Sequence, residues 1–279
     1  METLPDIRRR IRSVENTWKV IRAMEMISGA RLRRVQQFVT ATKPYVIRLR
    51  EIIGLLASSG RCRDPIFEPR EARRRALIVM SSDKGLCGGF NNAVADKAME
   101  VAGTGLGEDF IITIGKKCRE SFPAADPAVS DEMGGMPDVR KAAKLTARLI
   151  GMIRAGDLDT VNLIYNSYSG GRPSGPVVET VLPVTGIDAV EGDDRRIIFD
   201  PSPEEVLADA FPRYMTSMIL SAMAESLASE HSARLVSMAA ADASAAEMIE
   251  RLKLQRNKLR QACITREITE LVGGAGATA

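Results

Sequence analysis

The chain has 279 residues, of which 45% are apolar; this is enough to bury a sizeable core and excludes disorder throughout. A net charge of +3 excludes a histone-like or strongly acidic protein, and an aromatic content of 4% argues against a large stacking platform for single-stranded nucleic acid. The charge is uneven, because residues 1–50 hold 12 Lys and Arg against 4 Asp and Glu. The N-terminal segment is therefore a basic arm.

Apolar residues recur at alternating steps of four and three through residues 7–56, which predicts one long helix with a heptad seam. Three seam positions are polar instead, Glu25, Ser28 and Thr42, and such interruptions indicate register or a partner contact. We expect Pro44 to bend this helix without ending it, because the same phase resumes two residues later.

From about residue 76 the pattern changes to short apolar runs separated by Gly, Pro and polar residues. Four of these runs, ALIVMS, FIITIG, VNLIYNSY and VVETVLPV, are typical of strands. Helical stretches near residues 92–101 and 138–154 alternate with them, which predicts a small open α/β domain of Rossmann-like type. We therefore predict an N-terminal coiled-coil helix at residues 1–59, a central α/β domain at residues 60–203 and a C-terminal coiled-coil helix at residues 204–279.

The C-terminal helix is predicted to begin after an N-cap at Ser202, to bend at Pro212 and to stop at Gly273-Gly274. Neither long helix can hide its apolar stripe inside the small central domain. The economical arrangement pairs the two helices as a long antiparallel coiled coil that projects from the α/β domain. The apolar tip around residues 264–272 would then need a further partner, which implies larger neighbouring proteins.

No motif predicts a catalytic residue, a cofactor site or a metal site. Residues 81–91 follow a strand and precede a helix, but their glycines lack the Rossmann and Walker spacings, so a tight βα turn is favoured over a phosphate loop. The four cysteines are scattered and His231 is the single histidine, which leaves no zinc set. We expect four reduced thiols in the core and a structural or partner-facing His231.

Two other classes of function stay open on the residues alone. The basic arm could grip phosphates, as in a coiled-coil nucleic-acid binder, although the seam beneath it favours a solvated face or one that meets acidic protein. A nucleotide-using enzyme could be built on the α/β domain. No apolar run is long enough to span a bilayer and no secretory signal is evident, so we expect a cytoplasmic location without a membrane span.

Motifs in several places along the chain share one resemblance. They are DIRRRI and NT within residues 6–17, AMEM at 23–26, RLRR at 31–34, SDKGLCGGFN at 82–91, ASEHSAR at 228–234, and NK, RQA, IT, E, TE and VGG between 257 and 274. In this order, and over nearly the whole chain, they resemble the gamma subunit of F-type ATP synthases, the central rotor shaft. The resemblance implies a central-stalk subunit that couples transmembrane ion flow to ATP synthesis or hydrolysis in other chains.

The resemblance also implies the partners. The shaft would turn inside a ring of three alpha and three beta subunits, and the α/β domain would meet the epsilon subunit and the membrane c-ring at the cytoplasmic face of the plasma (inner) membrane. No cofactor, metal or nucleic acid is implied. The residues implied to contact the beta subunits are Met24, Glu25, Arg260, Gln261, Thr265, Thr269 and Glu270. Charge-assisted hydrogen bonds suit a grip that must be broken repeatedly.

The chain departs from the family pattern in the middle of the shaft. Residues 239–245 read AAADASA where the family usually reads like DNATxNA, and Arg256 stands where Tyr is frequent. Contacts of that stretch are therefore not carried over. The chain also lacks a closely spaced cysteine pair between the two long helices, so the thiol switch of chloroplast gamma subunits is not expected.

Overall fold

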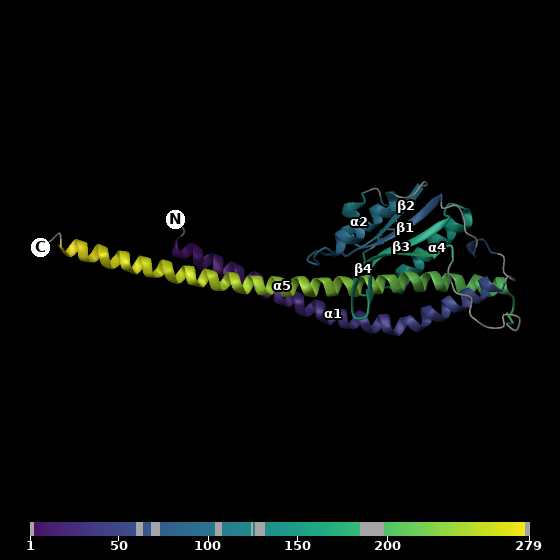
Figure 1. The fold of residues 1–279 in the computed structure, drawn as a ribbon, viewed down its shortest axis with the longest axis horizontal. Helices are drawn as coiled ribbons and strands as arrows, with labels where there is room; N and C mark the ends of the chain where they lie inside the picture. The colour runs from purple at the N-terminus through teal and green to yellow at the C-terminus, as the bar shows by residue number, and fades with distance from the viewer. Residues whose placement is uncertain are drawn as a thin grey trace. The chain divides into compact units, whose positions relative to one another are not determined.

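The computed structural model describes residues 3–59, 64–67, 73–103, 108–123, 125, 132–184 and 198–276. The chain forms two compact units. We call Met1–Ser28 with Leu235–Ala279 the helix-pair unit and Gly29–Arg234 the sheet unit. Both long helices, α1 (Leu4–Ser58) and α5 (Pro203–Gly276), contribute residues to both units (Figure 1).

The predicted heptad seam is confirmed over the whole of α1. All 15 seam positions are buried or half-buried: residues 7, 11, 14, 18, 21, 25, 28, 32, 35, 39, 42, 46, 49, 53 and 56. The set includes the polar positions Glu25, Ser28 and Thr42. Pro44 lies inside α1 and does not end it, as predicted, since the helix continues to Ser58.

The two long helices run antiparallel in each unit. In the helix-pair unit Ile7 and Ile11 pack in one cluster with Leu252, whereas Arg22 lies 3.7 Å from Asp242. In the sheet unit, α1 residues 36–51 line a groove with α5 residues 218–225, and α1 residues 45–52 line a pocket with α5 residues 205–213. Rising residue numbers on α1 thus pair with falling numbers on α5, as the coiled-coil prediction required.

Helix α5 begins as predicted and ends later. The Ser202 hydroxyl accepts a hydrogen bond from the backbone N–H of Glu205 at 3.2 Å, which is an N-cap contact. The predicted stop at Gly273-Gly274 is wrong, because the helix continues to Gly276. Glycine in a helix costs only about 1 kcal/mol relative to alanine and ends the helix only where it turns to a left-handed conformation.

The central sheet has four strands in the order β2-β1-β3-β4. Strand β1 (Arg74–Met80) pairs in parallel with β2 (Glu108–Ile114) and β3 (Thr160–Ser169), and β4 (Arg172–Leu182) is antiparallel to β3. The helices between them are α2 (Phe90–Gly103), α3 (Lys116–Ser121) and α4 (Val139–Ala155), and a short 3-10 turn, η1, covers Pro65–Phe67. This confirms the predicted small open α/β sheet.

Alternate residues of β1 face two separate apolar layers, as the period of a strand requires. Ala76, Ile78 and Met80 join the core that also contains residues of α1, α4 and α5. Leu77 and Val79 join the core that contains residues of α2 and α3. Both faces of β1 are therefore covered, which explains why the strand reads as an unbroken apolar run.

Candidate functional site

The first predicted contact residues, Met24 and Glu25, lie on α1 in the helix-pair unit and are half-buried. Ser28 beside them is buried, and its hydroxyl donates to the backbone carbonyl of Met24 at 2.7 Å. The polar interruption of the seam is thus stabilised within its own helix. Glu25 is the charged residue at this point of the seam.

The second group lies near the C-terminal end of α5. Arg260, Gln261, Thr265 and Thr269 are all exposed, and the side chain of Glu270 lies outside the described residues. The Thr265 hydroxyl donates to the Gln261 carbonyl at 3.0 Å, and the Thr269 hydroxyl donates to the Thr265 carbonyl at 2.8 Å. Both hydroxyls therefore bind the helix backbone rather than a distant side chain.

The structure does not bring the two groups together. Because Arg22 on α1 lies 3.7 Å from Asp242 on α5, Met24 and Glu25 lie beside the α5 residues that precede Asp242. Arg260 is about 27 Å further along α5, at 1.5 Å per residue. The predicted residues therefore form two separate patches on the helix-pair unit, not one site.

A buried polar cluster that no sequence motif predicts lies in the sheet unit. The side chain of Arg234 on α5 is 5% exposed, and its Nη1 lies 2.6 Å from Oε1 of Glu230. Its Nη2 donates to the carbonyls of Lys84 at 2.9 Å and Gly85 at 3.1 Å, and its Nε donates to Gly85 at 3.2 Å. We call Glu230, His231 and Arg234, with these two carbonyls, the Arg234 cluster. The cluster joins two of the motifs that carried the family resemblance, SDKGLCGGFN and ASEHSAR.

The loop that Arg234 binds, residues 81–89 between β1 and α2, is held by other parts of the sheet unit as well. The Asp83 carboxylate accepts hydrogen bonds from the backbone N–H groups of Met133 at 2.9 Å, Gly134 at 2.8 Å and Lys116 at 3.3 Å. Leu86 has a φ of 64°, which is rare for a residue other than glycine. These protein partners of the loop support the tight βα turn over a phosphate loop.

His231 is 2% exposed, and its Nδ1 lies 3.4 Å from Nη1 of Arg234. Burial, together with the charges of Arg234 and Arg31, lowers the pKa of His231 to about 4. The imidazole is therefore neutral near pH 7, and its Nε2 has no hydrogen-bond partner among the described residues. This environment supports the structural interpretation of His231.

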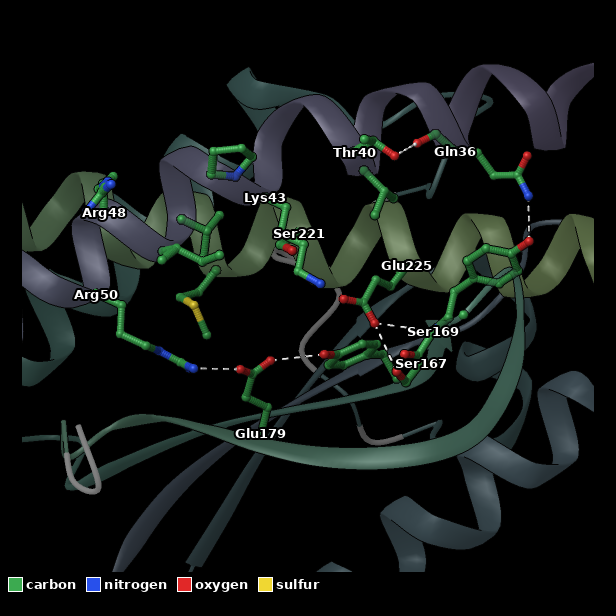
Figure 2. Close-up of a pocket in the computed structure, with 18 of the residues that line it drawn as sticks. Gln36, Thr40, Lys43, Arg48, Arg50, Ser167, Ser169, Glu179, Ser221 and Glu225 are labelled. Atoms are coloured by element: carbon green, nitrogen blue, oxygen red, sulfur yellow. Dashed lines mark hydrogen bonds and ion pairs between the residues drawn. The ribbon is translucent and has the colours of Figure 1, made fainter. Parts of the chain in front are cut away.

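A groove of about 900 Å³ lies between α1, α5 and the β3–β4 hairpin of the sheet unit (Figure 2). Within it, Glu225 accepts a hydrogen bond from the Ser167 hydroxyl at 3.0 Å. Glu179 accepts from Arg50 at 3.1 Å and from the Tyr165 hydroxyl at 3.0 Å. Both carboxylates are thus engaged by neighbours, and the described residues include no group of three or more His, Cys, Asp or Glu arranged to hold a metal ion.

The cysteines fit the predicted core role only in part. Cys87 and Cys118 are buried, and burial raises the pKa of Cys118 to about 12. Cys263 is exposed, so its predicted burial is wrong. Leu259, four residues earlier on α5, packs against the cluster of Ile7 near the start of α1, so Cys263 lies at the end of the helix pairing. Cys62 lies outside the described residues.

Comparison with known proteins identifies the family. Residues 3–278 match a family model described as ATP synthase. Curated relatives named ATP synthase gamma chain are 37% identical in Pelotomaculum thermopropionicum, 36% in Moorella thermoacetica and 33% in Nostoc punctiforme, each over 99% of both chains. The chain belongs to the ATP synthase gamma family.

Solved structures share the gamma fold at low identity. A chain from the Euglena gracilis mitochondrial ATP synthase, solved with OSCP, F1 and the c-ring, has a TM-score of 0.66 at 17% identity and covers 99% of this chain and 94% of its own. A chain of the Euglena gracilis rotor has a TM-score of 0.63 at 16% identity, over 94% of this chain and 98% of its own. None of these matches supports a nucleic-acid binder. The described part of this gamma-family chain has no helix that is both long enough and apolar enough to cross a membrane.

Proposed function

We propose that this chain is the non-catalytic rotor of an F-type ATP synthase. It turns inside a ring of three alpha and three beta subunits and couples transmembrane ion flow to ATP synthesis or hydrolysis in those subunits. The observation that carries the proposal is the unbroken seam of α1, 15 positions buried or half-buried, in a chain that matches the family from residue 3 to residue 278. A paired helix of this kind is suited to bear torque.

The mechanism requires a shaft whose surface differs from side to side. Each beta subunit then meets a different face of the shaft and adopts a different conformation, and turning the shaft shifts these conformations in sequence. The exposed arginines of the basic arm, Arg8, Arg9, Arg10 and Arg12, make the surface of α1 outside its seam basic near the start of the helix. They suit acidic surfaces on the surrounding subunits.

The partners proposed for the α/β domain follow from the same family assignment. The α/β domain, residues 60–203, would meet the epsilon subunit and the c-ring at the cytoplasmic face of the inner membrane. The domain division at residues 59 and 203 remains a prediction, which limited proteolysis would test: protected fragments should end near these positions.

The main test of the rotor function is reconstitution of this chain with alpha and beta subunits. The tagged chain should copurify with them at one copy per three of each, and an actin or bead probe on it should rotate when MgATP is added. Recovery of the chain alone, without ATPase activity in the same fraction, would contradict the proposal. Calorimetry of the isolated chain with ATP should show no binding if the subunit is non-catalytic.

We propose the two patches as beta-subunit contacts: Met24 with Glu25, and Arg260, Gln261, Thr265, Thr269 and Glu270. Replacing Arg260 and Gln261 together by Ala should lower the torque of the assembled complex without unfolding the chain, because both side chains are exposed. Arg266→Ala is the matched control, an exposed residue of the same stretch outside the proposed set. An equal loss of torque in the control would contradict the assignment of Arg260 and Gln261 as beta-subunit contacts.

A truncation tests the shaft as a whole. Removing the residues after Ile264 should weaken coupling and torque while the sheet unit keeps its melting transition, because the removed residues belong to the helix-pair unit. Loss of the sheet unit's transition would contradict this separation of roles.

A further inference from the structure

Arg234 connects two stretches of the sheet unit that are 149 residues apart in sequence. The guanidinium group donates to the carbonyls of Lys84 and Gly85 and pairs with Glu230. A guanidinium presents its donors in a rigid planar fork, so these contacts fix an angle as well as a distance. The side chains of Arg234 and Glu230 are 5% and 8% exposed, which shields the contacts from competing water.

The loop at the other end of these contacts is fastened to the sheet. The backbone N–H of Ser81, directly after β1, donates to the carbonyl of Ile114 in β2 at 2.7 Å. The Ser81 hydroxyl accepts from the backbone N–H of Cys118 at 2.8 Å, and Asp83 holds Met133 and Gly134. A force applied to Lys84 and Gly85 is therefore passed directly to the strands.

Glu225 on α5 also binds the sheet directly, because it accepts hydrogen bonds from the Ser167 hydroxyl at 3.0 Å and from the Tyr168 backbone N–H at 3.2 Å. Other contacts between α5 and the sheet are apolar. Met215, Ile219, Met223 and Leu227 belong to the apolar core beneath the sheet. Apolar burial resists the separation of two surfaces but has little directional preference. Hydrogen bonds, in contrast, are directional. Arg234 is also the last residue of α5 in the sheet unit, so it stands where the helix leaves that unit.

We propose that Arg234 is a positioning residue that locks α5 to the loop at residues 81–89, so that torque travelling along α5 is passed to the α/β domain at this point. The inference rests on the proposed rotor function and deepens it, because it assigns the torque joint to one side chain. Loss of the joint should leave α5 itself able to turn but let the α/β domain lag behind it.

The test compares the torsional stiffness at two probe positions in the complex reconstituted with alpha and beta subunits. Met99→Cys attaches a gold-rod probe to α2 at a residue that is 50% exposed. In a separate variant, Ala208→Cys attaches the probe to α5, also at an exposed residue. Both are made in a background in which Cys62 and Cys263 are Ser. The stiffness is read from the width of the angular distribution of the probe while the rotor pauses.

In the variant Arg234→Gln, we expect the angular variance to rise about twofold at position 99 and to stay unchanged at position 208, because the directional contacts to the loop are lost while α5 is intact. The matched control is Arg251→Gln. Arg251 forms the same i,i+4 pair with Glu247 at 2.6 Å, but in solvent, and its loss should widen neither distribution.

Equal widening at positions 99 and 208, or none at either, would overturn the proposal. Failure of the parent complex to rotate with either probe would instead count against the rotor function. Arg234→Lys decides the matter if the Gln variant does not assemble, because Lys keeps the charge beside Glu230 but lacks the planar fork. The Lys variant should widen the distribution at position 99 only; a Lys variant as stiff as the parent would overturn the proposal.

Discussion

Arg75 and Asp109 form a two-point ion pair across the neighbouring strands β1 and β2, with Nε–Oδ1 and Nη2–Oδ2 distances of 2.7 and 2.8 Å. Both side chains are 12% exposed. We expect Asp109→Asn to lower the free energy of unfolding by about 2–4 kcal/mol, because it leaves the guanidinium charge of Arg75 buried without its partner. Urea unfolding monitored by circular dichroism measures the loss.

The control for this pair lies in the same domain. Glu100 pairs with Lys97 on α2 at 2.9 Å, but Glu100 is 63% exposed. Glu100→Gln should therefore change the free energy of unfolding by less than about 0.5 kcal/mol. Similar losses in the two variants would show that burial does not set the value of these pairs.

Replacement by Ala at two different glycines should change the free energy of unfolding in opposite directions. Gly115 has a φ of 99°, and a Cβ there would overlap the backbone carbonyl of Ser81, whereas Gly151 lies inside α4 with no atom near its would-be Cβ. Gly115→Ala should lower the free energy of unfolding by about 3 kcal/mol or more through strain and overlap. Gly151→Ala should raise it by about 1 kcal/mol through helix propensity. Thermal melting of both variants checks the opposite signs.

His231 predicts a pH dependence of stability. Its pKa falls from the ordinary 6.5 to about 4 in the folded chain, so the unfolded chain binds the proton more readily. The stability contributed by the neutral imidazole is complete above about pH 6.5 and is lost as the pH falls toward 4, by up to roughly 3 kcal/mol. His231→Gln should flatten the unfolding free energy between pH 7 and pH 4.5 relative to the parent. Since the chain has one His, parallel curves would contradict the assignment.

The helix-pair unit predicts a measurable coupling between its two helices. Ile11 and Leu252 are 6% and 5% exposed and pack in one cluster. Each change to Ala should cost about 2–4 kcal/mol, and the double variant should cost less than the two together by about 0.5–2 kcal/mol. Strict additivity would mean that the two side chains do not share a contact. Val20→Ala, 61% exposed on the same helix, should change the free energy of unfolding by less than about 0.5 kcal/mol.

The long helices and the strands could be predicted because their periods repeat. The four-and-three spacing of seam residues from Ile7 to Leu56 continues across Pro44. A proline that leaves this spacing unchanged is tolerated in a helix that is supported by packing against a second helix. The strands were evident as apolar runs between turns, since both faces of β1 are buried. The predicted end of α5 at Gly273 is wrong, because a glycine pair ends a helix only through a local backbone conformation that the sequence does not specify.

The contacts between distant segments could not be predicted in the same way. The spacing of Glu230 and Arg234 allows an ion pair on one helix turn, but nothing local indicates that the Arg234 fork would also reach the carbonyls of Lys84 and Gly85. The exposure of Cys263 on α5 depends on where α1 begins. It is therefore set by the register between the two helices and not by the residue type. The two patches of predicted beta-subunit contacts stay predictions, because their significance depends on other chains.

The hydroxyls of Ser28 and Thr42 both donate to carbonyls of their own helix, at 2.7 and 2.9 Å. They occupy seam positions at which other polar side chains would bridge the two helices. Twisting α1 against α5 would break neither bond, so these positions offer little resistance to winding. The stretch at residues 239–246, where six of eight residues are Ala, adds little bulk on the facing helix. If the chain turns as proposed, a helix pair built in this way would yield in torsion near residue 28 more readily than one bridged by side chains of both helices.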